Sequence, residues 1–178
     1  MKTGKSSILT FFFLITLVQL NAQGQAIIEG FGQTFEVDNP GFKTDTTIEY
    51  KVVFDIHNTP DDPSQVNPYI NTLARFLNMH TKAGVPLKNL KVVGVFHNKA
   101  SVDVLDNEAY RAKFGVDNPN IPLMKALTEA GANLYMCGQS MAARNVPQEK
   151  MVPQVETALS AMTVFLSLQA KGYQLIRF

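Results

Sequence analysis

Hydrophobic and polar positions follow two different spacings from residue 50 onwards, and together they predict strands separated by helices. Short runs rich in β-branched and aromatic residues, bounded by turn residues, are typical of strands. Such runs lie at residues 50–57, 90–96, 132–136 and 173–178. Cys137 directly follows the third run.

Apolar residues spaced three and four positions apart predict the helices between these strands. The first helix begins either near Pro63 or at Asn67, which would cap a first turn that contains Pro68. Its apolar stripe consists of Val66, Ile70, Leu73, Leu77 and His80.

Further helices are predicted over residues 102–114 and 123–130, with a short helical stretch after a turn at Gly138. The last predicted helix ends at Gly172. Its apolar stripe consists of Val155, Leu159, Met162 and Leu166.

The resulting order, β-α-β-α-α-β-α-β, predicts one α/β domain over residues 50–178, with a mainly parallel sheet covered on both faces. Ligands of open parallel sheets bind beyond the carboxyl ends of the strands. His57, His97 and Cys137 lie at three such ends, so we expect them to share one edge of the sheet. Whether they touch depends on the strand order, which the sequence does not state.

The first 22 residues have the layout of a secretory signal peptide. Lys2 and Lys5 precede an apolar run over residues 8–20, and the segment ends with the small residue Ala22. The run is short for a membrane span, so we expect cleavage near Ala22 and export, either periplasmic or secreted, although a retained anchor is the alternative. Residues 23–49, with scattered glycines, predict an irregular N-terminal arm.

Composition and charge exclude several kinds of function. The 178 residues carry a formal net charge of +1, which provides no electrostatic footprint for nucleic acid. The single cysteine cannot form an intramolecular disulfide or a zinc site built from thiolates alone. We expect no metal, no cofactor, no nucleic-acid partner and no stable membrane insertion.

Cys137 is the main candidate for chemistry. A thiolate is the reactive form of cysteine, and a nearby cation or helix N-terminus lowers its pKa. Gly138, Gln139 and Ser140 offer a turn, amides and a hydroxyl to the sulfur, and Arg144 is a candidate cation. The alternative is an inert, buried cysteine. A sulfur sealed in the core would exclude a role as an exposed nucleophile.

The histidines differ in their positions. His80 continues the apolar stripe of the first helix and is expected to be a core or boundary residue. His57 and His97 follow strands, where each could take part in chemistry or simply cap a loop. Asp55, Asp61 and Asp62 could hold a hard cation, but an acidic solvated loop is the more common explanation.

The segment GANLYMCGQS (residues 131–140), the helix-forming residues 155–167 and the ending LQAKGY (residues 168–173) resemble the DsrE/DsrF-like family, which includes sulfur-relay and YchN-like proteins. The resemblance spans residues 50–178. It implies a three-layer α/β/α fold with four or five strands and homo-oligomers, either trimers or hexamers. It also implies that Cys137 matches the cysteine that carries sulfur as a persulfide.

The resemblance favours a sulfur carrier, with a sulfur-donor or acceptor protein as partner. In this hypothesis Gly138, Gln139 and Ser140 stabilise the Cys137 thiolate, and His97 or His57 assists proton movement. The polar loop at Asn98 would border the same site. The alternative is a non-catalytic, oligomeric small-ligand-binding or assembly protein that uses the same crevice.

Overall fold

A single parallel sheet forms the centre of the molecule. The computed structural model describes residues 26–178, so the expected signal peptide at residues 1–22 lies outside the described residues. Five strands are hydrogen-bonded in the order β4-β3-β2-β1-β5, and every pair is parallel. The strands are β1 (Tyr50–Ile56), β2 (Leu90–Phe96), β3 (Asn133–Cys137), β4 (Glu156–Ala158) and β5 (Gln174–Ile176).

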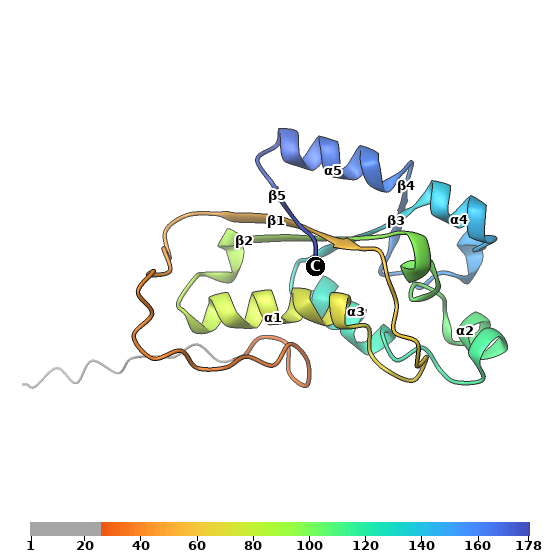
Figure 1. Ribbon diagram of the computed structural model, residues 1–178, viewed down its shortest axis with the longest axis horizontal. Coiled ribbons are helices and arrows are strands. Elements are labelled where there is room, and N and C mark those ends of the chain that lie inside the picture. The colour runs from red at the N-terminus through yellow and green to blue at the C-terminus, as the bar shows by residue number, and fades with distance from the viewer. Residues whose placement is uncertain (1–25) are drawn as a thin grey trace, which may run out of the picture.

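Helices cover both faces of this sheet, which confirms the expected three-layer α/β/α fold. Helices α1 and α3 lie on one face and α5 lies on the other (Figure 1). The α-helices are α1 (Pro68–Lys82), α2 (Asn107–Phe114), α3 (Ile121–Glu129), α4 (Gly138–Arg144) and α5 (Ala161–Ala170). Short 3-10 helices are η1 (Leu87–Asn89), η2 (Asn98–Val102) and η3 (Gln148–Lys150).

The two faces of the sheet are unequally packed. The larger core lies on the side of α1 and α3 and includes Ile56, Leu73 and Met136. The smaller core on the α5 side is formed by Val53, Val93, Val95, Cys137 and Ala161. Cys137 therefore belongs to the thinner of the two layers.

Helix α1 begins at the second of the two positions that the sequence allows. The Asn67 side chain accepts a hydrogen bond of 2.8 Å from the amide of Tyr69, and Pro68 occupies the first turn. His80 is a boundary residue, as expected. Its ring contacts Phe76 and Tyr50, and burial lowers its pKa although a hydrogen bond to the Phe76 carbonyl opposes this shift.

Several predicted boundaries are wrong. The helix expected over residues 102–114 begins only at Asn107, because Asp106 caps it by accepting from the amide of Ala109. No turn separates Cys137 from the following helix, since Gly138 is the first residue of α4.

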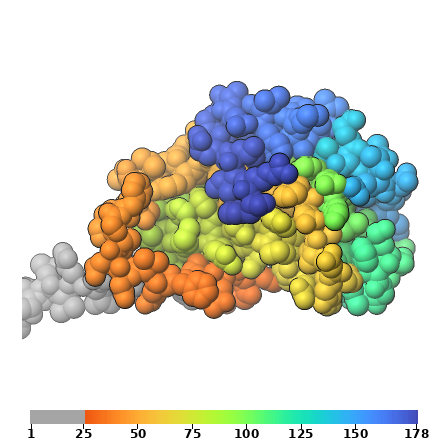
Figure 2. Space-filling model, viewed as in Figure 1, coloured from red at the N-terminus to blue at the C-terminus, as the bar shows by residue number. Residues whose placement is uncertain are grey.

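The last predicted helix is also too long. Residues 156–158 form the edge strand β4, and α5 starts at Ala161 after Ser160 accepts from the amide of Thr163. Of the predicted apolar stripe, only Val155 is buried. The side chains of Leu159, Met162 and Leu166 are exposed instead. In Figure 2 the C-terminal segment, in blue, forms the upper surface of the molecule.

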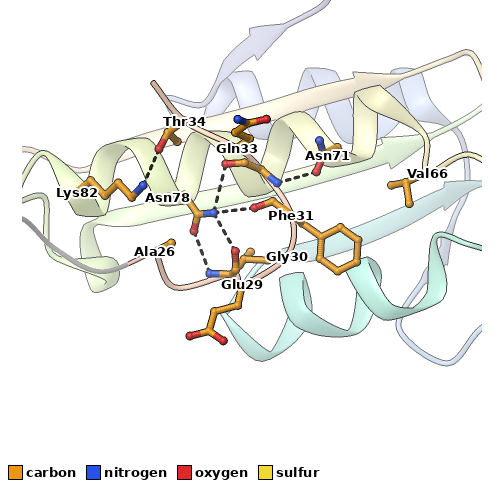
Figure 3. Close-up of a pocket in the computed structure, with 12 residues that line it drawn as sticks. Ala26, Glu29, Gly30, Phe31, Gln33, Thr34, Val66, Asn71, Asn78 and Lys82 are labelled. Carbon is orange, nitrogen blue, oxygen red and sulfur yellow. Dashed lines mark hydrogen bonds between the residues drawn. The ribbon is translucent and has the colours of Figure 1, made fainter. Parts of the chain in front are cut away.

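The arm packs against the outer side of α1. Residues 26–49 contain no helix or strand. The buried Asn78 side chain donates to the carbonyls of Ile28 and Phe31 and accepts from the amide of Ile28, while Asn71 accepts from the amide of Gly32 (Figure 3). A Cβ at Gly32 would lie 2.4 Å from the backbone of α1, so only glycine permits this approach.

Candidate functional site

The strand order brings the three expected residues to one edge of the sheet. Strands β1, β2 and β3 are neighbours, with Ile56 opposite Phe96 and Phe96 opposite Met136. His57, His97 and Cys137 each follow one of these residues and therefore lie level with one another. Neighbouring strands are about 4.8 Å apart, so the three positions form one short row across the sheet.

Asp55 lies at the centre of a charged cluster at this edge. Its carboxylate oxygen Oδ1 is 2.6 Å from Nε2 of His97 and 3.6 Å from Nδ1 of His57, and Oδ2 is 3.3 Å from Nε of Arg177. The expectation that Asp55 belongs to a solvated acidic loop is wrong. It lies within β1 and its side chain is buried, because it shares the α5-facing side of the sheet with Val53.

The two histidines differ in their hydrogen bonding. His97 is held directly by the Asp55 carboxylate. Nδ1 of His57 is buried and has no hydrogen-bond partner among residues 26–178, since 3.6 Å is too long for such a bond with Asp55. The His57 ring instead packs against Tyr69, with ring centroids 5.3 Å apart. His97 is thus the better oriented of the two.

Cys137 ends β3 and occupies the cap position of α4. Only 5% of its surface is exposed, and it packs with Val95 and Ala161 in the smaller core. The expectation of an exposed nucleophile is therefore wrong for the folded protein, because Cys137 is buried. It is covered by the smaller core on the α5 side rather than by the thick core on the α1 side.

Hydrogen bonds to the sulfur shift its acidity. Burial is the largest single influence and raises the pKa of the Cys137 thiol. The Ser140 hydroxyl and the backbone amides of Ala161, Ser140 and Gln139 lower the pKa, and their combined effect prevails. Donors of this kind stabilise a thiolate because they place partial positive charge beside the sulfur.

Ser140 connects Cys137 to the loop after β2. The amide of Asn98 donates to the Ser140 hydroxyl oxygen over 3.1 Å, and the Arg144 guanidinium donates to the side-chain oxygen of Asn98. The proximity of Asn98 to the site was expected. Arg144, the candidate cation, is placed at Asn98 by this hydrogen bond, and the groups that lower the pKa of Cys137 are the Ser140 hydroxyl and backbone amides.

Gly138 permits close packing beside the sulfur. A Cβ at this position would lie 2.8 Å from the carbonyl oxygen of Ala158 at the end of β4. That distance is shorter than real contacts of this kind, so a larger residue would displace the β4–α5 connection and with it the Ala161 amide.

Arg177 and the Ala161 amide are site components that the sequence did not indicate, and Asp55 was considered only as a cation ligand or a loop residue. Asp55 precedes His57 by two positions, so the alternation of a strand could have placed both side chains on the same face. Arg177 follows Ile176, which is opposite Phe54, and therefore lies level with Asp55. Nothing local in the sequence indicates the Ala161 amide, which the crossover to α5 brings to the sulfur.

Side chains that could bind a metal ion are not clustered in the part of the chain that the structure describes. Within residues 26–178 there is no group of three or more His, Cys, Asp or Glu side chains that could hold a metal ion. Asp62 accepts hydrogen bonds from Ser64 and Gln65 in its own loop.

None of the helices in this part of the chain has the length and apolar character needed to cross a bilayer.

The fold and the site define a class of three-layer α/β/α proteins with a thiol at the carboxyl edge of a parallel sheet. The chain belongs to the DsrE/DsrF-like family, whose family model matches residues 51–178. The expected resemblance is thereby confirmed. No curated protein sequence matches the chain.

Two solved structures share the fold. One is the protein of unknown function MTH1491 from Methanobacterium thermoautotrophicum, at 18% identity and a TM-score of 0.55, covering 73% of this chain and 100% of that one. The other is the ychN protein from E. coli, at 13% identity and a TM-score of 0.51, covering 72% of this chain and 99% of that one.

Proposed function

We propose that this protein is a sulfur carrier that holds a sulfane sulfur on Cys137. The observation that carries the proposal is the hydrogen-bonded thiol, whose pKa is lowered by Ser140 and three backbone amides although burial opposes the shift. Membership of the DsrE/DsrF-like family, which is associated with sulfur relay, supports the same function.

The proposed transfer requires no external oxidant or reductant. The Cys137 thiolate attacks the terminal sulfur of a donor persulfide, the sulfur–sulfur bond of the donor breaks, and the donor leaves as a thiolate. A new sulfur–sulfur bond forms on Cys137. The same exchange in reverse would deliver the sulfur to an acceptor thiol, so a donor or acceptor protein is the partner that this chemistry requires.

His97 is the proposed proton acceptor for the thiol. Its Nε2 lies 2.6 Å from the Asp55 carboxylate, which orients the ring and leaves Nδ1 for proton exchange. His57 has no comparable hydrogen bond. We therefore assign proton acceptance to His97. His57 lies beside Asp55 and is not assigned this step.

Access to the sulfur requires a local movement, because only 5% of Cys137 is exposed. The covering segment includes Ala161, the only residue of α5 that is buried. Val164, Phe165 and Leu168 of the same helix pack against the smaller core but are only partly buried, and elements with few buried contacts open locally at lower cost than the rest of a fold. In the proposal, displacement of the start of α5 exposes the sulfur to the donor.

The test is the intact mass of the protein after incubation with a low-molecular-weight persulfide. We expect the native protein to gain the mass of one sulfur atom and the Cys137→Ser variant to gain none. A reducing agent should reverse the gain. An unmodified native protein, in a sample where iodoacetamide still labels Cys137, would refute sulfur transfer.

The second candidate is a non-catalytic oligomeric binding or assembly protein of the same fold, and two observations favour it. Cys137 is buried, and the outer side of the β4–α5 segment exposes Leu159, Met162 and Leu166 at 72%, 71% and 70%. Helix α5 has no charged residue, and its exposed side mixes Met162 and Leu166 with the polar Thr163, Ser167 and Gln169. A homo-oligomer, as a trimer or hexamer, would cover this face.

A further inference from the structure

A depression of about 670 Å³ lies between α2, η2 and the end of α4, next to the Cys137 site but separate from it. This volume is in the range of small-molecule binding sites. Its charged lining residues are Lys99, Lys113 and Arg144, and no Asp or Glu lines it. We call this depression the basic groove.

The three cations of the basic groove are not neutralised by neighbouring acids. None of them forms a salt bridge with a carboxylate of residues 26–178. The Lys113 ammonium lies 5.6 Å from the ring centroid of Phe114, and Arg144 donates to the neutral side chain of Asn98. In contrast, the nearby Arg111 and Lys150 are paired with Asp117 and Glu108.

The remaining surface of the basic groove is largely apolar. Leu105 and Val146 are buried, and Val102, Ala109 and Phe114 are partly buried. An inorganic anion would contact the cations but leave this apolar surface in water. A ligand that carries both an acidic head and an apolar body would satisfy both parts of the lining.

We propose that the basic groove binds a small amphipathic organic anion. Its acidic head lies between Lys99, Lys113 and Arg144, and its apolar body covers Leu105 and Phe114. This site goes beyond sulfur transfer, because none of its lining residues is among the groups that lower the pKa of Cys137 and binding does not require Cys137. Arg144 also holds Asn98, so the bound anion should perturb the Asn98 amide.

The test is a titration of the ¹⁵N-labelled protein, followed by ¹H–¹⁵N NMR, with phenylbutyrate as the probe. We expect a Kd on the order of 1 mM, as is typical of such a small ligand. Shift changes should concentrate in residues 98–114 and 143–147. Phenylbutanol, which lacks the charge, and inorganic phosphate, which lacks the apolar body, should each bind at least about tenfold more weakly.

Variants locate the binding site. The double variant Lys99→Gln/Lys113→Gln should weaken phenylbutyrate binding at least about tenfold, the factor that corresponds to losing roughly one charge-assisted contact. Both lysines are exposed, so the fold should be retained, as the dispersion of the same spectra will show. The matched control is Lys88→Gln, an exposed lysine in η1 that does not line the groove.

Three results would overturn the basic groove as an anion site. They are equal binding of phenylbutanol, equal binding by the double variant, and shift changes that map to α5 or the arm. Absence of binding would do the same. Cys137→Ser should bind phenylbutyrate as the native protein does, so a failure of sulfur transfer and a failure of anion binding are distinguishable.

Discussion

At the scale of single residues, Ser140 is the side chain that most directly controls the Cys137 thiol. It donates to the sulfur and accepts from the amide of Asn98. We predict that Ser140→Ala raises the thiol pKa, because one donor to the thiolate is lost, and that iodoacetamide labels Cys137 several-fold more slowly near neutral pH.

Ser167→Ala, on the exposed side of α5, is the matched control and should leave the labelling rate unchanged. If Ser140→Ala reacted as fast as the native protein across the pH range, the hydroxyl would have no part in stabilising the thiolate.

Asp103 provides a pH-dependent contribution to stability. It is fully buried, and burial raises its pKa to about 6 although hydrogen bonds from Thr59, Asn67 and Asn120 lower it. The folded protein then binds a proton more tightly than the unfolded chain. This contribution is therefore complete below the unfolded pKa of 3.8 and is lost as the pH rises through about 6.

We predict that the free energy of unfolding of the native protein, relative to that of Asp103→Asn, falls by up to about 3 kcal/mol between about pH 4 and about pH 7. Urea denaturation at both pH values measures the difference. Asp117→Asn, an exposed carboxylate in the next loop, should show no comparable change. A difference for Asp103→Asn that is independent of pH would contradict the prediction.

The candidate site could be predicted only where its residues follow a strand. His57, His97 and Cys137 were found because a short apolar run precedes each of them. Asp55 lies inside such a run, and a polar residue within a strand is normally predicted to face solvent. Its burial comes from neighbours that are distant in the sequence, among them His97 and Arg177, and is therefore a property of the tertiary structure.

At the scale of elements, the arm and α1 are joined mainly by one side chain. Asn78 forms hydrogen bonds with the backbone of Ile28, Phe31 and Gly32. We predict that Asn78→Leu releases the arm, because these backbone groups lose their partners, at a cost of roughly 2 kcal/mol in unfolding free energy. Hydrogen exchange at the Ile28 and Gly32 amides measures the release directly.

Met79→Ala, an exposed position one residue further along α1, is the control and should leave these amides protected. Unchanged exchange in Asn78→Leu would show that packing of Ile28 and Phe31, rather than the asparagine, holds the arm.

The elements differ in how well the sequence predicts them. Helix α1 has an apolar stripe that is readable because it is local, and its Asn67 cap was one of the two starts that the sequence allowed. Strand β4 has only three residues and pairs only with β3, so its residues Glu156, Thr157 and Ala158 show no strand pattern. The apolar residues of α5 face in all directions, and the sequence alone does not show which of them meet the sheet.

At the scale of the whole molecule, the exposed apolar face of the β4–α5 segment leads to a prediction about assembly. We predict a homo-oligomer at micromolar concentration, because Leu159, Met162 and Leu166 would otherwise remain in water. Light scattering coupled to size-exclusion chromatography measures the mass. Met162→Glu/Leu166→Glu should shift the protein towards the monomer, and a monomeric native protein would contradict the prediction.

The N-terminal segment, residues 1–22, is expected to be a signal peptide that directs export and is then removed. We predict that N-terminal sequencing of the protein recovered from the producing cell begins close to Gln23, as cleavage near Ala22 requires. A mature protein that begins at or next to Met1 would contradict cleavage near Ala22 and favour the retained anchor. Export would also mean that the sulfur donor and acceptor act outside the cytoplasm.

The most direct test of Cys137 as the functional centre is the pH dependence of its alkylation in the folded protein. Iodoacetamide labelling, followed by intact mass, reports the fraction of thiolate because only the thiolate reacts. We predict a midpoint below that of a free cysteine thiol, in agreement with the lowered pKa. A midpoint at or above the free-thiol value, or labelling that occurs only after denaturation, would contradict a functional thiol.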